Sequence, residues 1–303
     1  MGSTFVACGR QIIIRGRLLR IASIDGDGFR FLDNPEPIIS TLRASAKRID
    51  LFTFVQRLPE TTPKYKHPFE WDNFAALQIS TFDNWWNEVL GFKGRNKAKQ
   101  AEKKGVQVRE IPLNEELIEG IWQIYNECPI RQGKRFPHYG MTREEIREYA
   151  GTFLDCSVFL GAFLDESLIG FAKLTIDESG TQAGLMHIIS LIAHREKAPT
   201  NALIAQAVRS CEARGIPYLV YAKFGYGKKR RDSLSDFKGR NGFQRVDIPR
   251  YYVPLSPLGN LAFRAGMHRK IVDFLPEFLI AKLRSCRAAL YRASSLSRSN
   301  VSS

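Results

Sequence analysis

One segment in the middle of the chain is dense in side chains that could do chemistry. It holds groups able to exchange a proton and groups able to hold an anion: Glu127, Arg131, Arg135, His138 and Tyr139. A carboxylate or an imidazole can act as a general base, and arginine binds carboxylates and phosphates through paired hydrogen bonds. A solvated basic loop would have a similar composition, so both interpretations stay open here.

A second candidate segment, residues 194–202 with the sequence HREKAPTNA, lies where an apolar strand gives way to a predicted helix. The basic side chains of Arg195 and Lys197, and the free N–H groups of a helix that starts at Thr200, would attract a phosphate. Thr200 and Asn201 could equally be ordinary helix caps.

The apolar strand before it, residues 183–193, carries His187 and Ser190. A single histidine in an apolar strand is more often a satisfied core side chain than a catalyst. Because these two residues are three apart, they face opposite sides of the strand unless a bulge intervenes. We therefore expect only one of them in a site.

Hydrophobic periodicity, caps and turn residues predict the elements that must position these groups. In the second part of the chain the order is strand, two helices, three strands, helix, strand. The predicted elements are residues 106–111, a helix capped by Asn114, 142–154, 158–164, 168–176, 183–193, 200–214 and 218–223. The first part is predicted to hold a hairpin at 11–24 and 28–32, a helix at 36–47, strands at 51–55 and 74–79, and a helix at 82–104.

Composition limits the class of protein. The chain has 303 residues and a formal net charge of +14, which implies attraction to a nucleic acid, a phosphorylated donor or an anionic membrane. Its five widely spaced cysteines fit neither a disulfide framework nor a zinc site, so we expect a cytoplasmic protein without a metal. Arginines interrupt the apolar stretch near the amino terminus, so we expect no signal peptide and no integral membrane segment.

Two stretches carry a family resemblance: residues 95–106, RNKAKQAEKKGV, and residues 233–243, SLSDFKGRNGF. Together they resemble FemAB-type proteins, a branch of the GNAT superfamily of acyltransferases. In that branch a basic helix precedes the second GNAT lobe, and a Phe-Lys-x-x-x-Gly-Phe-like stretch leads into the last strand. The resemblance covers about residues 82–254, whereas the first eighty residues match only as a degenerate first lobe.

The resemblance and the element order imply an α/β (α+β) fold of the GNAT type. We expect a mixed, mainly antiparallel sheet flanked by helices, arranged as a tandem pair of one degenerate and one complete lobe. The expected units are a mixed module at residues 1–105, a GNAT-like domain at 106–257, and a basic amphipathic helix with a Ser-rich tail at 258–303. This last helix would either dock on the protein itself or lie on an anionic membrane.

The resemblance also implies a reaction: transfer of an acetyl or aminoacyl group to an amine, by direct attack on the donor carbonyl. GNAT folds place the first inter-helix loop over the acceptor, which assigns proton transfer to Glu127, His138 and Tyr139. Acceptor binding is assigned to Arg131, Arg135, His187 and Ser190. Donor binding is assigned to Arg195, Lys197, Thr200, Asn201, Lys238 and Asn241.

The donor segment departs from the family pattern, because residues 194–202 lack the glycines of the usual pyrophosphate loop and Pro199 lacks an N–H group. We therefore expect coenzyme A to bind weakly. Acyl-CoA and aminoacyl-tRNA both stay open as donors, and no permanently bound cofactor is expected.

The expected acceptor is the amine of a small molecule, glycan or peptide, such as an amino sugar or a cell-envelope precursor, with tRNA and an anionic membrane surface as further partners. The alternative function is a non-catalytic GNAT-like module that binds RNA or an anionic membrane at the inner face of the cell.

Overall fold

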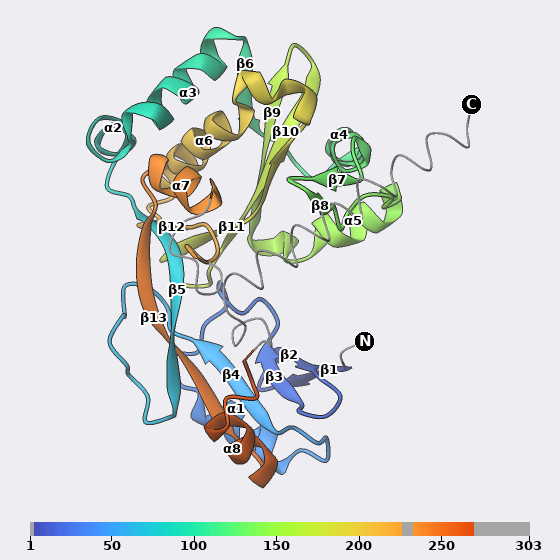
Figure 1. Ribbon diagram of the computed structural model, residues 1–303, viewed down its shortest axis with the longest axis vertical. Helices are drawn as coiled ribbons and strands as arrows, with labels where there is room; N and C mark the ends of the chain where they lie inside the picture. Colours follow the sequence, from blue (N-terminus) through green and yellow to red (C-terminus); the bar gives the residue numbers. More distant parts are fainter. Residues whose placement is uncertain (1–2, 226–232, 270–303) are drawn as a thin grey trace.

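The computed structural model describes residues 3–225 and 233–269, in which eleven strands form one continuous sheet (Figure 1). The strand order is β1-β2-β3-β4-β13-β5-β12-β11-β10-β9-β6. The strands are β1 Ser3–Ala7, β2 Arg10–Arg15, β3 Ile21–Ile24, β4 Leu51–Val55, β5 Phe69–Gln78, β6 Val106–Glu110, β9 Ser157–Leu164, β10 Ser167–Ile176, β11 Gln182–Ser190, β12 Tyr218–Val220 and β13 Gln244–Pro254, with a separate hairpin of β7 Ile130–Arg131 and β8 Lys134–Arg135.

Helices cover both faces of the upper part of the sheet, with α3, α6 and α7 on one face and α4 and α5 on the other (Figure 1). Their bounds are α1 Glu36–Ala44, α2 Phe82–Asn84, α3 Phe92–Lys103, α4 Glu115–Asn126, α5 Arg143–Gly151, α6 Pro199–Ala213, α7 Ser233–Arg240 and α8 Pro257–Arg264. A π-helical turn η1 spans Trp85–Val89, and 3-10 turns span η2 Leu154–Cys156 and η3 Ile192–Lys197.

Local sequence explains why the helices form where they do. The Asn114 side chain accepts the backbone N–H of Leu117 at 3.0 Å and so caps α4, whose apolar face then packs on β10. Thr142 and Glu145 form a capping box at the start of α5. These two helices close the core on the face that carries the predicted acceptor loop.

Two long strands join the two ends of the sheet. β5 pairs with both β12 and β13, and β13 also pairs with β4. Strands from residues 1–105 and 106–257 therefore share one sheet, with β13 inserted between β4 and β5, although each end buries its own apolar cluster. The division into modules and the degenerate nature of the first one stay predictions.

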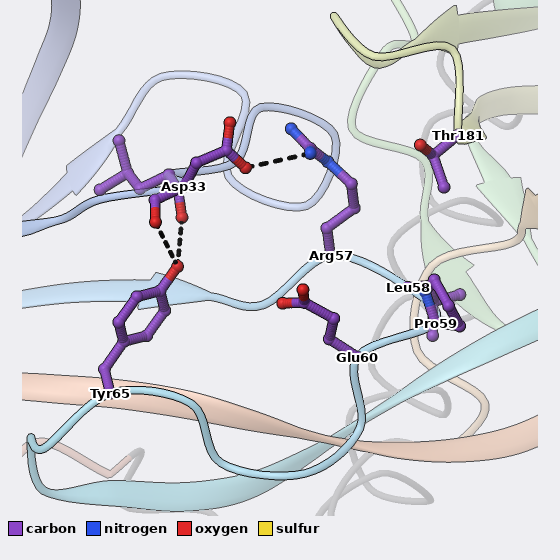
Figure 2. A pocket seen from close by; sticks show the side chains of 8 residues that line it. Asp33, Arg57, Leu58, Pro59, Glu60, Tyr65 and Thr181 are labelled. Carbon is purple, nitrogen blue, oxygen red and sulfur yellow. Dashed lines mark hydrogen bonds and ion pairs between the residues drawn. The ribbon is translucent and has the colours of Figure 1, made fainter.

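A small cavity of about 190 Å³ lies between the loop after β4 and the turn between β10 and β11 (Figure 2). Arg57 crosses it, with its guanidinium 3.1 Å from Asp33 and 2.9 Å from the buried carboxylate of Asp177. The Tyr65 hydroxyl donates to the Leu32 carbonyl at 2.6 Å. Ligand pockets commonly have volumes of about 300 to 1,000 Å³. This cavity is smaller, and we interpret it as a polar contact between the first and the second part of the chain.

The mixed, mainly antiparallel sheet flanked by helices confirms the predicted fold class. The predicted hairpin is wrong, because β3 pairs with β2 through a turn at Gly16 rather than with residues 28–32. Gly16 has φ +96°, and a Cβ there would lie 2.0 Å from the Leu19 carbonyl oxygen. The helix predicted at 82–104 is broken, because Leu90 and Gly91 have extended backbone that separates η1 from α3.

The basic helix predicted at 258–303 falls mostly on residues 270–303, which lie outside the described part of the chain. Its first residues form α8, which packs on β13. No helix within the described ranges is long and apolar enough to span a bilayer.

The packing of α3 on α7 gives a first prediction. A Cβ at Gly94 would lie 2.3 Å from the Arg240 carbonyl oxygen, so Gly94→Ala should push the two helices apart and lower the free energy of unfolding by about 1 to 3 kcal/mol. Gly239→Ala is the matched control, because a Cβ there meets nothing within 4 Å. Urea unfolding should show equal or greater stability for the control, and a stable Gly94→Ala protein would contradict the close approach.

Candidate active site

The sheet opens between β11 and β12. These strands pair in parallel only over residues 182–184 and 218–220, after which the backbone of Tyr221 pairs with Ala75 of β5. From Leu185 onward β11 keeps β10 as its one strand partner within the described residues, with a register shift opposite Lys173 and Leu174. Backbone groups along this side of β11 are therefore available to a ligand.

A cavity of about 1230 Å³ lies beside this opening. Its walls come from α3, the β7–β8 hairpin, the end of β11, η3, the start of α6, and α7. Its basic lining residues are Lys93, Lys97, Arg131, Arg195 and Arg240, against one carboxylate, Glu196. This excess of cationic side chains suits an anionic ligand.

Three of these cations are available to a ligand. Within the described residues, the side chains of Lys93, Arg195 and Arg240 make no hydrogen bond or ion pair. They approach the cavity from three different elements, α3, η3 and α7. Several phosphates, or one extended phosphate ester, could therefore be held along the cavity wall.

The start of α6 forms one end of the cavity. Ala198 precedes it in the left-handed conformation, with φ 53°, and Pro199 occupies the first helical position. Thr200 and Asn201 line the cavity, and the Thr200 hydroxyl lies 3.3 Å from the Ser190 hydroxyl. Of the two candidate residues on β11, Ser190 therefore lines the cavity and His187 does not.

Two buried amides fix the distance between α6 and α7. The Asn201 side chain donates to the Asn241 side-chain oxygen at 3.0 Å, and Asn241 donates in turn to the Phe237 carbonyl at 2.8 Å. Both asparagines line the cavity while most of their surface is covered. Their main effect is therefore to hold the walls in place.

Arg131 and Glu127 tie the predicted acceptor loop to the end of β11. The Arg131 guanidinium donates to the Ser190 carbonyl at 2.8 Å and pairs with Glu127 at 2.8 Å. The Glu127 carboxylate also accepts the backbone N–H groups of Ile192 and Ala193, at 2.8 and 2.9 Å. With these three partners Glu127 positions η3, and its assignment to proton transfer stays a prediction.

A cluster of imidazole and phenol rings occupies the other face of β11. The His138 ring stacks on Tyr125 with centroids 4.7 Å apart, and Tyr149 lies 5.0 Å from His138 and 5.1 Å from His187. Burial lowers the pKa of His138. Burial, with His138 and Lys173 nearby, lowers the pKa of His187 to about 4. Both imidazoles are thus able to accept a proton at neutral pH.

Lys173 is a buried cation behind this cluster, and its strand position pairs with His187. Its ammonium donates to the Ala150 carbonyl at 2.8 Å and to the Thr152 carbonyl. Burial lowers the pKa of Lys173 to about 8. A lone lysine in a predicted strand gives no local signal of burial, so the sequence did not point to Lys173.

The remaining predicted residues lie away from the cavity. Lys238 is fully buried, with its ammonium 2.6 Å from the Lys223 carbonyl and 4.4 Å from the centre of the Tyr221 ring, which lines the cavity. Lys197 pairs with Glu196 at 3.0 Å. Arg135 and Tyr139 are exposed on the acceptor loop.

Sequence reasoning missed several lining residues: Lys93, Asn96, Lys97, Gln132, Tyr221, Ser233, Leu234, Phe237 and Arg240. Some of them fall inside the two stretches that carried the family resemblance, and that was the one signal that could have found them. Phe237 contributes to both the core and the cavity wall.

The depressed pKa of His187 predicts acid sensitivity. Because the unfolded chain takes up a proton near pH 6.5 and folded His187 only near pH 4, stability should fall as the pH drops from 6.5 to 4, by on the order of 3 kcal/mol. His187→Gln should remove that part of the loss in urea unfolding measured across this range. A histidine NMR signal that titrates near 6.5 and disappears in the variant would contradict the burial.

No family model and no curated protein sequence matches the chain. Among solved structures, FemX matches with a TM-score of 0.57 and 11% identity over 86% of this chain and 90% of FemX. L-PGS from Bacillus licheniformis matches with a TM-score of 0.56 and 12% identity over 86% and 87% of the two chains. A C-terminal domain from Agrobacterium fabrum described as lysylphosphatidylglycerol synthetase matches with a TM-score of 0.54 and 13% identity over 88% of each chain.

At these identities the matches concern the fold. Each match spans at least 86% of this chain, so the likeness extends into the first hundred residues and is not limited to the second part of the sheet. The chain therefore shares the fold of FemX and of the lysylphosphatidylglycerol synthetase domain, which is the fold that its two motifs indicated.

Proposed function

We propose that this protein is an acyltransferase that moves an acyl or aminoacyl group from a phosphate-bearing donor to an acceptor amine. The observation that carries the proposal is the cavity beside the open edge of β11. It brings Arg195 and Thr200 of the predicted donor segment together with Arg131 of the predicted acceptor loop. FemX and the lysylphosphatidylglycerol synthetase domain share this fold, and the name of the latter states that its product is a lysine-bearing lipid.

The donor that we propose is an aminoacyl group on the 3′ end of a tRNA. The cavity is larger than the usual small-molecule pocket of about 300 to 1,000 Å³. Its free cations are spread over α3, η3 and α7, which suits a chain of phosphodiesters better than one compact pyrophosphate. Pro199 at the first position of α6 also removes one N–H group from a pyrophosphate site.

The donor carbonyl would lie along the open edge of β11. Backbone N–H groups beyond Gly184 that have no strand partner on this side could donate to the oxygen as negative charge develops on it. The amine then attacks the carbonyl carbon directly. The ester C–O bond breaks, the ribose oxygen leaves with its electron pair, and this oxygen finally takes up the proton that the amine loses. Holding both reactants against β11 supplies much of the rate enhancement.

The acceptor amine would approach from the face that carries the imidazole cluster. His138 and His187 are the proposed proton acceptors, because both are neutral at pH 7 and lie on the acceptor loop and on β11. The proposed acceptors are amines of amino sugars, peptides or other cell-envelope precursors. Lys173 behind His187 disfavours a second positive charge there and so favours the unprotonated amine.

Donor binding tests the cavity. Arg195→Gln and Arg240→Gln should each weaken binding of an aminoacylated RNA minihelix about tenfold or more, because each removes a charged contact to phosphate. Lys103→Gln is the control, since Lys103 is an exposed cation on α3 that does not line the cavity. Fluorescence anisotropy at several salt concentrations gives the affinities. Tight acetyl-CoA binding that is lost in Arg195→Gln would contradict the proposed donor class.

Turnover tests the imidazoles. His138→Gln and His187→Gln should lower kcat, by about 10² to 10⁴ for the one that takes the proton, with the donor affinity unchanged. His67→Gln serves as the control, because His67 bonds to Glu36 in the first half of the chain. Wild-type kcat in both variants would remove the cluster from the mechanism. A wild-type protein that binds donor without turnover, over a panel of amines, would favour the non-catalytic alternative.

A further inference from the structure

Three segments converge around the buried carboxylate of Asp50 at the end of the molecule remote from the cavity. Asp50 accepts the Arg20 backbone N–H at 2.9 Å and the Ser256 hydroxyl at 2.8 Å. Arg48 donates to the Leu18 carbonyl at 2.8 Å. The β2–β3 turn, the segment before β4 and α8 therefore form one continuous surface, at the lower end of the molecule in Figure 1.

Close packing holds this surface together. A Cβ on Gly259 of α8 would lie 1.8 Å from the Asp50 carbonyl oxygen, so the helix is pressed against the strand. The Ser256 hydroxyl caps α8 by accepting the Gly259 N–H at 3.0 Å. The three segments are thus fixed relative to each other.

The surface is basic and also exposes large apolar side chains. Residues 15–20, 46–48 and 257–269 contain no Asp or Glu, and their exposed basic residues are Arg15, Arg17, Arg20, Lys47, Arg48, Arg264 and Arg269. Between these lie large aliphatic side chains in water: Leu18 is 87% exposed, Leu261 62% and Met267 61%. Leu258 and Leu261 share the outer face of α8, because they are three residues apart.

Carboxylates cancel little of this charge. Asp50 is buried and bonded to all three segments, and Glu70 pairs with Arg269. The side chains of Arg17, Arg20 and Arg264 have no hydrogen bond or ion pair within the described residues. The surface therefore keeps a net positive charge around its leucines.

We propose that this surface, which we call the Asp50 face, binds the surface of an anionic lipid bilayer. Arginines would meet the phosphates of the headgroups, and Leu18, Leu261 and Met267 would enter the boundary between headgroups and acyl chains. This inference is independent of the proposed reaction.

Two features favour a bilayer over other anionic partners. The exposed apolar side chains are aliphatic and stand apart on separate loops, whereas surfaces for single-stranded nucleic acids present aromatic rings on which bases stack. Arginines flank each of them, so the apolar groups and the charges would reach one flat interface together. Residues 270–303, which follow directly, add six basic and two acidic residues to the sequence.

Vesicle co-sedimentation of the full chain tests the proposal. We expect binding to vesicles of 30% phosphatidylglycerol in phosphatidylcholine and little binding to phosphatidylcholine alone. The triple variant Arg17→Gln, Arg20→Gln, Arg264→Gln should lower the partition coefficient about 100-fold, at about 1 kcal/mol for each basic residue. Leu18→Ser with Leu261→Ser should lower it at least about tenfold, because two leucines no longer enter the bilayer.

Matched controls change exposed apolar and basic residues elsewhere on the surface. Phe92→Ser removes a side chain that is 76% exposed on α3, and Lys99→Gln, Lys103→Gln, Lys134→Gln removes three exposed cations outside the Asp50 face. Both controls should bind vesicles with an affinity within about threefold of wild type, because charges outside the contact surface are screened within about 10 Å. Thermal unfolding should show that every variant is folded.

Several outcomes would overturn the proposal. These are absent binding of the wild type to anionic vesicles, an equal loss in the lysine control, and wild-type binding in both Asp50-face variants. A loss of RNA binding in these variants with vesicle binding unchanged would instead assign the surface to a nucleic acid. A loss of concentration-dependent dimerisation, again with vesicle binding unchanged, would assign it to a second copy of the chain.

Discussion

The site depends on one constraint on backbone hydrogen bonding: β11 and β12 pair for only three residues and then separate. Unpaired backbone polar groups are costly inside a protein, and here they face a cavity, while β12 and the residues after it stay paired with β5. The pairing with β5, which comes from the first half of the chain, continues past the opening through Tyr221. The first half is thus part of the scaffold of the site.

Buried polar groups keep the two sides of this opening apart. The amides of Asn201 and Asn241 set the separation of α6 from α7, and the Glu127–Arg131 pair holds the acceptor loop against the end of β11. Removing one partner of such a pair leaves a desolvated group without a bond, which costs more than the bond itself contributes. These residues are therefore expected to affect function through geometry even where they do not touch a substrate.

Charge is distributed unevenly over the molecule. The cavity has cations from three elements that make no bonds within the described residues, while the imidazole cluster across β11 is kept neutral by burial and by the nearby Lys173. The Asp50 face carries a third group of cations, mixed with exposed leucines. The basic residues of the sequence are therefore divided among sites with different chemistry. The net charge alone did not show that these sites are separate.

The sequence by itself determined the order of elements in the second part of the chain, because caps and hydrophobic periods are local. Asn114 and Thr142 cap helices as predicted, and the strands at 158–164 and 168–176 lie within one residue of their predicted starts. Tertiary structure decided which polar residues meet. Lys93 and Arg240 lie far apart in the chain and share the cavity only because α3 and α7 pack at Gly94. The residue type of Lys238 suggested a phosphate ligand. Its position on α7 buries it against Tyr221 instead, because a helix can present only one face to a cavity.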